Sequence, residues 1–503
     1  MTDRTPRIAL LPLDERPVNL LLPIDVGRVA GVPVDVPPSE ALPRLREPGD
    51  VDALAVWLSD RAADPAVTHL VVSIDMLLYG GLIPGRTSHD TLLEALSRLD
   101  VLRRIHASRP DLTISAVTLV MRASDSYSAA EEPDYWSSYG RELHALGADV
   151  HRLGAGDDVP PLAALTDVPA DVVSDFATRR LRNHVVNLAC LQLVEEGVLD
   201  FLAVTADDTA VHSAGSAEQE WLRHWLRFLP SGRSVLMYPG ADEVGAVLVA
   251  RALSSASATS VAFRVECPQP GGLELVPPYE NQPLAASIER QVRAAGGRLV
   301  TADGADVALV VHAPDPARHD MFNGYPDAVD HAAIEATVDA IRRESALGHR
   351  VALADVRYPN GSDAALLWRL AEEDLLGRLV AFSGWNTAGN TLGSVVALAT
   401  ASVAGSRAGS ADEDALRRAL LTRLLDDFVY QSVVRTEVAP SFFPDSLPVD
   451  DESLISSAET AFTERMQEIM SASLPSSGWT LASVTLPWRR SFEVEIGLTP
   501  SAH

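Results

Sequence analysis

Two neighbouring carboxylates, Asp207 and Asp208, directly follow a short apolar run, in the stretch TADDTA. Adjacent carboxyl groups can take different roles: one stays ionised and orients a substrate, while the other, shielded from water, holds a proton for a leaving group. Carboxylate pairs used in this way hydrolyse glycosidic bonds. We therefore expect Asp207 and Asp208 to be the catalytic pair of a glycoside hydrolase. The alternative is that one of them only caps the next helix.

A second arrangement of the same chemistry uses Asp355, which follows another apolar run in ADVRYPN. Here Asp208 would be the acid and Asp355 the nucleophile, as in retaining enzymes whose carboxyl groups lie about 5 Å apart. Asp242 and Glu243 compete for either role, although acidic residues also stabilise the beginning of a helix. The same alternative applies to Glu131 and Glu132.

Polar and aromatic side chains follow nearly every apolar run of the chain. Carboxylates, arginines and asparagines can bind sugar hydroxyls, and aromatic rings can stack on a pyranose ring. Because parallel strands present their carboxyl ends at one edge, these side chains are expected to converge there. The residues expected to bind substrate are Asp14, Arg16, Asp75, Tyr79, Arg122, Tyr127, Asp242, Glu243, Trp385 and Asn386.

The elements that would position these residues alternate between short β-branched runs and amphipathic stretches, which is typical of βα units around a parallel sheet. Strands are expected over residues 7–13, 69–74, 113–121, 200–205, 234–238, 307–312, 351–354 and 379–382. Eight such units predict a (β/α)8 TIM-like barrel with insertions. An open doubly wound sheet, or two Rossmann-like halves, would fit the same alternation.

The expected domain organisation places the catalytic barrel in residues 1–404, with an insertion around 255–305. Residues 405–503 change in character and predict a mostly helical C-terminal appendage with a closing hairpin over 479–498.

The chain has 503 residues and no lysine, so all 41 basic residues are arginine. Without an ε-amine there is no Schiff-base aldolase, pyridoxal-phosphate enzyme or Walker-type phosphate loop. A net charge of −28 argues against nucleic acid or an anionic membrane surface as a partner. Two distant cysteines, and no apolar run long enough for a membrane span or a signal peptide, indicate a soluble cytoplasmic protein.

The leading hypothesis is thus a glycoside hydrolase that acts on small saccharides, N-acetylated ones among them, without a cofactor or metal; a homo-oligomer is compatible with it. Two other classes stay open. A metal-dependent hydrolase or isomerase would use His184, His212, His312 and His319 with Asp14 or Asp75, although no metal-binding motif is present. The other class is a non-catalytic sugar-binding protein.

Six motifs occur in order along nearly the whole chain: LPLDERPVN, SIDMLLYGGLIPGR, RNH, TADDTA, YPGADEVG and GWNTAGN. With them, the chain resembles an uncharacterised bacterial family catalogued as domain of unknown function 4127, a resemblance that implies no activity. More loosely, Asp-Asp after one strand and Trp-Asn after another resemble the barrel-type substrate-assisted β-N-acetylhexosaminidases. That resemblance implies that Asp207 steadies the 2-acetamido group, that Asp208 is the general acid/base, and that Trp385 and Asn386 contact the sugar.

Overall fold

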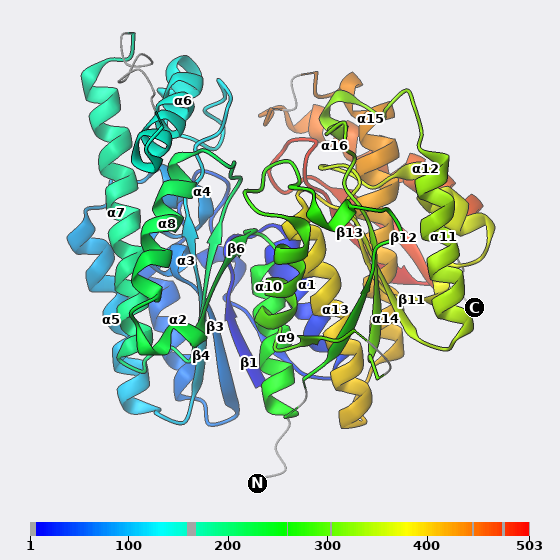
Figure 1. Ribbon diagram of the computed structural model, residues 1–503, viewed down its shortest axis with the longest axis horizontal. Coiled ribbons are helices and arrows are strands. Elements are labelled where there is room, and N and C mark those ends of the chain that lie inside the picture. Colours follow the sequence, from blue (N-terminus) through cyan, green and yellow to red (C-terminus); the bar gives the residue numbers. More distant parts are fainter. Residues whose placement is uncertain are drawn as a thin grey trace. The chain divides into compact units, whose positions relative to one another are not determined.

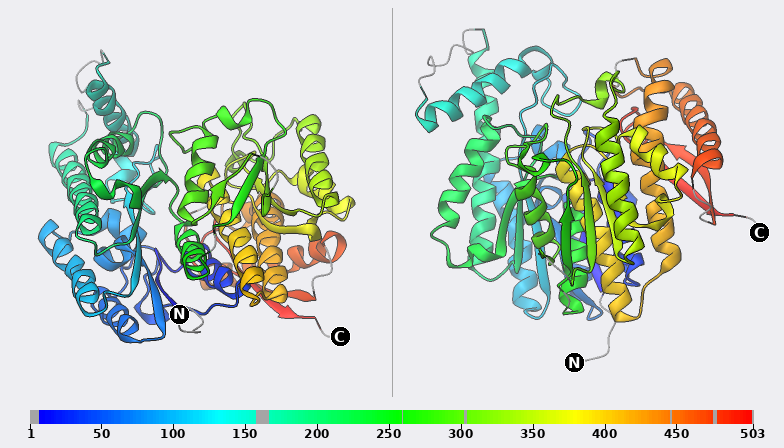
Figure 2. Two further views of the ribbon diagram at one scale, coloured as in Figure 1. Left: turned by 60° about the horizontal axis from the view of Figure 1, so that its bottom comes forward. Right: turned by 45° about the vertical axis from the view of Figure 1, so that its right-hand side comes forward.

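The computed structural model describes residues 7–157, 167–258, 260–301, 304–444, 447–474 and 478–501. The chain divides into two compact units (Figures 1 and 2). Unit 1 comprises the described residues of Met1–Glu15, Pro33–Leu248 and Tyr279–Gln282, and unit 2 those of Arg16–Val32, Val249–Pro278 and Pro283–His503.

Unit 1 is built on a six-stranded sheet with the order β2-β1-β3-β4-β5-β6, in which all neighbours are parallel. The strands are β1 (Arg7–Leu11), β2 (Val34–Asp35), β3 (Val67–Ser73), β4 (Thr113–Val120), β5 (Phe201–Ala206) and β6 (Val235–Pro239). The strand β5, with the sequence FLAVTA, is buried at all six positions, as expected of a parallel strand covered on both faces.

The helices of unit 1 follow its strands along the chain. They are α2 (Val51–Ala63), α3 (Ile74–Tyr79), α4 (Leu82–Thr87), α5 (Leu92–Ser108), α6 (Trp136–Ala155), α7 (Ala170–Glu195) and α8 (Ala214–Leu226). Helix α2 packs on β1 and β3, and α7 packs on β4, β5 and α5. Local signals fix several helix ends: α5 begins at a capping box in which the Thr91 hydroxyl and the Glu94 carboxylate satisfy each other's backbone N–H groups.

Unit 2 contains a five-stranded parallel sheet with the order β11-β10-β9-β7-β8. Its strands are β7 (Ala262–Glu266), β8 (Arg298–Leu299), β9 (Val307–His312), β10 (Arg350–Asp355) and β11 (Leu379–Ser383). The antiparallel pair β12 (Trp479–Thr485) and β13 (Glu495–Pro500) forms where the sequence indicated a closing hairpin, and β12 packs against α16, as Figure 2 shows at its right-hand side.

The helices of unit 2 are α1 (Pro17–Val29), α10 (Leu284–Ala294), α11 (His331–Ala346), α12 (Ala364–Glu372), α13 (Ala388–Ala408), α14 (Glu413–Arg423), the π-helix η7 (Leu424–Val434), α15 (Arg435–Glu437) and α16 (Glu452–Ser473). Helix α13 packs on β10 and β11, and α11 packs on β9 and β10. Helix α9 (Val244–Ala256) contains the boundary between the units. Short 3-10 turns lie at Ser39–Ala41, Pro230–Ser234, Gly272–Glu274, Met321–Asn323, Leu376–Arg378 and Ala439–Ser441.

The α/β class expected from the sequence is correct, but a closed (β/α)8 barrel is not confirmed. The eight expected strands all occur within a residue or two of their predicted bounds, and they divide between two open sheets. Two strands outside the eight expected ranges, β2 at Asp35 and β7 within the expected insertion, complete these sheets together with β8. The reason is that alternating βα units produce the same sequence pattern in a barrel and in an open parallel sheet. Residues 405–503 lie within unit 2 and do not form a unit of their own.

Candidate active site

A network of six charged side chains lies at the carboxyl ends of β4 and β5 in unit 1. Its two cations are Arg86 and Arg122, and its four anions are Glu131, Glu132, Asp207 and Asp208. We call these six residues the carboxylate network. Its position is where parallel α/β sheets bind their ligands.

Arg122 is the most connected member of the carboxylate network. Its Nε donates to Glu132 at 2.8 Å, one terminal nitrogen donates to Glu131 at 3.0 Å, and the other donates to Asp208 at 2.8 Å. All the nitrogens of its planar guanidinium therefore bind carboxylates. Such charge-assisted hydrogen bonds fix both partners in position.

Arg86 is the second cation and is only 3% exposed. It donates to Asp207 through one terminal nitrogen and to Glu131 at 3.0 Å through the other. Glu131 therefore bridges the two arginines. Buried guanidinium groups of this kind hold their carboxylate partners without supplying a proton.

Local backbone geometry explains how Arg86 reaches the network. Helix α3 ends at Gly80 in the left-handed conformation, with φ 79°, and Gly81, with φ 134°, precedes α4, which carries Arg86. A Cβ atom at Gly80 would lie 2.6 Å from the carbonyl oxygen of Gly49. Only glycine fits both the conformation and the close approach.

The two aspartates of TADDTA differ in exposure. The Asp207 side chain is 10% exposed and is bound to Arg86, whereas the Asp208 side chain is 30% exposed. Asp208 also has φ 25°, a conformation that costs energy for a residue with a Cβ. Each aspartate is held by one arginine, Asp207 by Arg86 and Asp208 by Arg122, and Asp208 is the member that solvent or a substrate can reach.

Burial raises the pKa of Asp208, and the neighbouring charge of Asp207 raises it further, while Arg122 and Arg86 act in the opposite direction. Four carboxylates around two guanidinium groups leave the carboxylate network with an excess of two negative charges if every group is ionised. A proton held on Asp208 relieves this excess. The arrangement therefore favours proton uptake by the more accessible carboxyl group, Asp208, beside the more buried carboxylate of Asp207.

Asp75 lies next to the carboxylate network, in the first turn of α3. It is 8% exposed, and one of its oxygens accepts the Leu119 N–H at 3.2 Å. Burial raises the pKa of Asp75 to about 7, and the charge of Asp207 contributes to the rise. Tyr79 is 2% exposed with the Arg182 guanidinium 4.5 Å from its ring centre, so its ring packs inside the unit.

Four further residues expected to bind substrate also lie in unit 1. Asp14, Asp242 and Glu243 are at most 4% exposed. Glu243 accepts the Ala241 N–H at 3.0 Å, so it holds the turn after β6. Tyr127 is 47% exposed and donates its hydroxyl to Glu142 at 2.8 Å.

The carboxylate network lies in unit 1, whereas unit 2 contains the remaining predicted residues, Asp355, Arg16, Trp385 and Asn386. Asp355 is 1% exposed, and its two oxygens accept the N–H groups of Arg357 and Asp363 at 3.2 and 2.7 Å. Burial raises the pKa of Asp355 to about 6.

The three other unit 2 residues with a predicted substrate contact are Arg16 and Trp385, which lie against aromatic rings, and Asn386, whose backbone is left-handed. Trp385 is 4% exposed with its ring 5.9 Å from Phe492, and Asn386 has φ 58°. Arg16 lies over the Trp488 ring at 4.3 Å and within 3.6 Å of Glu493. Trp385 therefore presents little ring surface to a sugar.

A buried His–Asp pair in unit 2 was not predicted as a pair. His312 contacts Thr337 through Nδ1 at 2.8 Å and Asp363 through Nε2 at 3.3 Å. The Thr337 hydroxyl donates to the Ala333 carbonyl, so the His312 Nδ1 is the donor in the first contact. Asp363 also accepts two N–H groups at the beginning of α12, a role that the turn sequence PNGSD could have indicated.

Within the ranges that the structure describes, no group of three His, Cys, Asp or Glu side chains is arranged to hold a metal ion. The histidines considered for a metal site are therefore not gathered with Asp14 or Asp75 among those residues. None of the described helices is long and apolar enough to cross a membrane.

The family described as "Protein of unknown function (DUF4127)" matches residues 8–497, and the chain belongs to this family. No curated protein and no solved structure matches the chain.

Proposed function

We propose that the chain is a glycoside hydrolase that acts on small saccharides, N-acetylated ones among them, by carboxylate general acid/base catalysis. The observation that carries the proposal is the unequal pair at the end of β5: Asp207 is buried against Arg86, whereas Asp208, bound to Arg122, is more accessible and has a raised pKa. When two carboxyl groups lie in different environments, one can act as the general acid while the other stays ionised.

In the first step, the protonated Asp208 donates its proton to the glycosidic oxygen as the bond from that oxygen to C1 breaks. The carbonyl oxygen of the 2-acetamido group attacks C1 and forms an oxazolinium ion, which keeps its N–H proton, so C1 exchanges its bond to the leaving oxygen for a bond to the carbonyl oxygen. Asp207 orients the acetamido group. Arg86 donates to Oδ2 of Asp207, and none of the described residues donates to Oδ1. Oδ1 therefore accepts the amide N–H of the acetamido group. The Asp208 carboxylate then removes a proton from the water that attacks C1, and the bond from C1 to the carbonyl oxygen breaks, which restores the acetamido group and the protonated Asp208.

The alternative arrangement, with Asp355 as the nucleophile, predicts a different substrate range. A carboxylate nucleophile needs no acetamido group, so it would hydrolyse plain hexosides as well. Both oxygens of Asp355 already accept backbone N–H groups, which lowers their nucleophilicity. These contacts favour the substrate-assisted arrangement.

The test uses the full chain with aryl N-acetyl-β-hexosaminides and the matching aryl hexosides. Asp208→Asn is expected to lower kcat by roughly 10² or more on the N-acetylated substrate, the usual scale for a general acid/base. Asp125→Asn is the matched control, because Asp125 lies in the loop after β4 with its side chain 69% exposed. Full activity of Asp208→Asn would refute the assignment, and saturable binding without turnover by the wild type would indicate a non-catalytic sugar-binding protein.

A further inference from the structure

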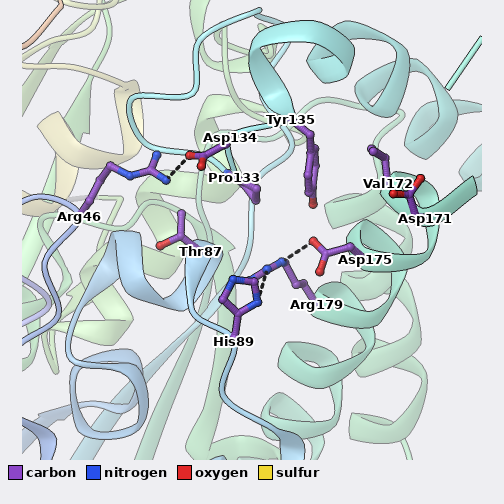
Figure 3. Close-up of a pocket in the computed structure, with 10 residues that line it drawn as sticks. All are labelled: Arg46, Thr87, His89, Pro133, Asp134, Tyr135, Asp171, Val172, Asp175 and Arg179. Atoms are coloured by element: carbon purple, nitrogen blue, oxygen red, sulfur yellow. Dashed lines mark hydrogen bonds and ion pairs between the residues drawn. The ribbon is translucent and has the colours of Figure 1, made fainter. Parts of the chain in front are cut away.

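Unit 1 contains a cavity of about 270 Å³ that is distinct from the carboxylate network (Figure 3). Its walls come from the loop that precedes α6, from the first turns of α7, from Thr87 at the end of α4 and His89 after it, and from Arg46. Pockets for drug-sized ligands enclose about 300–1,000 Å³, so this cavity is suited to a smaller ligand, such as one sugar ring.

The cavity adjoins the carboxylate network along the chain. Thr87, in its wall, directly follows Arg86, and Pro133 directly follows Glu132. Arg46 joins the two places: it donates to the Glu132 carbonyl at 2.7 Å and to the Asp134 carboxylate at 2.8 Å. One loop thus carries catalytic-site carboxylates and, immediately afterwards, cavity residues.

The charges in the cavity wall are nearly balanced. Arg46 pairs with Asp134, and Arg179, 8% exposed, pairs with Asp175 at 2.6 Å (Figure 3). Asp171, in the first turn of α7, is exposed and has no ion pair among the described residues. Both guanidinium groups are therefore already neutralised, and the remaining charge is negative. This balance disfavours a phosphate or carboxylate ligand and favours a neutral ligand that donates hydrogen bonds.

Two side chains supply the other contacts that a sugar needs. Arg179 donates to Nδ1 of His89 at 3.1 Å, which places the histidine proton on Nε2, and His89 is exposed, so this N–H can donate to a ligand. Tyr135 stands in the cavity wall with its hydroxyl directed toward Asp175 and Arg179 (Figure 3). Its ring gives the cavity an aromatic surface.

We propose that this cavity binds a second saccharide unit, next to the unit whose glycosidic bond is cleaved. The assignment rests on the proposed function for the identity of the reaction, and it implies that the natural substrate has at least two sugar units. Asp171 accepts from hydroxyl groups, His89 donates, and the Tyr135 ring contacts the apolar face of the sugar.

The test measures binding by calorimetry to the full chain carrying Asp208→Asn, so that turnover is slow during the measurement. The probes are N-acetylglucosamine, N,N′-diacetylchitobiose and, to detect an amine ligand, glucosamine. Tyr135→Ala and Asp171→Asn are each expected to weaken disaccharide binding about tenfold and to leave monosaccharide binding within about twofold. The control is Asp125→Asn, with thermal unfolding as the check of folding for every variant.

Unchanged disaccharide affinity in both variants would overturn the cavity assignment, and so would the absence of measurable binding to the parent protein. Preference for glucosamine over both N-acetylated probes would overturn it in favour of an amine site. The failure of the proposed function is separately visible: the wild type would then bind the disaccharide through Tyr135 and Asp171 without hydrolysing it.

Discussion

Replacing Arg122 by methionine tests whether the carboxylate network depends on this cation. The change keeps much of the apolar stem and removes three hydrogen bonds, to Glu131, Glu132 and Asp208. Glu132, at 3% exposure, is then left with Arg86 at 3.9 Å as its nearest cation. Removing one partner of a buried ion pair typically lowers the free energy of unfolding by about 3–5 kcal/mol, because the other partner stays buried without its counter-charge.

The assay is chemical denaturation of the full chain at several pH values. At pH 8 we expect Arg122→Met to lower the free energy of unfolding by about 3–5 kcal/mol, a large fraction of the roughly 5–15 kcal/mol of a typical domain. At pH 5 the loss should be smaller. Without the cation, the folded carboxyl groups hold protons more strongly than the unfolded ones, so stability falls as pH rises.

Arg141→Met is the matched control, because Arg141 is 60% exposed and its nearest carboxylate, Asp125, is 3.9 Å away. We expect a change below about 1 kcal/mol in this variant. The reasoning would be refuted if Arg122→Met and Arg141→Met destabilised the protein equally, or if the effect of Arg122→Met did not depend on pH.

Three further predictions concern single residues. In the folded protein the pKa of Asp75 is raised to about 7, so the contribution of its protonated form to stability is complete below about pH 4 and is lost as pH rises through 7. Asp75→Asn should remove this part of the pH dependence, on the order of 3 kcal/mol between pH 4 and 8, as measured by denaturation. Asp363→Ala should destabilise by about 1 kcal/mol more than Asp363→Asn, because asparagine still accepts the Ala365 N–H at the beginning of α12; equal thermal unfolding of the two variants would contradict this. Gly80→Ala should cost more than about 2 kcal/mol, whereas Gly154→Ala, inside α6 with open space around it, should be neutral or slightly stabilising; denaturation midpoints compare the two.

The strands were predictable because buried parallel strands are short, apolar and rich in β-branched residues. Val307–His312, for example, has the expected bounds. Sheet closure was not predictable, because a barrel and an open sheet contain the same βα units. Strand pairing such as β7 with β9 depends on contacts between segments distant in sequence, and the local pattern does not encode it.

Part of the site also followed from the sequence. The carboxylates of TADDTA lie at the carboxyl edge of the sheet in unit 1, because parallel strands all end there. Their partners could not be found by spacing: Arg86 and Asp207 are 121 residues apart, and Glu131 was equally compatible with a helix beginning. Trp385 was expected to contact a sugar, but its ring is buried against Phe492. Spacing could not predict this contact, because Phe492 lies more than a hundred residues later in the chain.

The role of Asp208 as a general acid is tested most directly by the dependence of the Asp208→Asn rate on the leaving group. Aryl N-acetyl-β-hexosaminides with a dinitrophenol leaving group need little protonation, whereas those with a methylphenol leaving group need full protonation. We predict that Asp208→Asn lowers kcat/KM by roughly 10²–10⁴ for the methylphenyl substrate and by about tenfold or less for the dinitrophenyl substrate. An equal loss for both leaving groups would contradict general acid catalysis by Asp208.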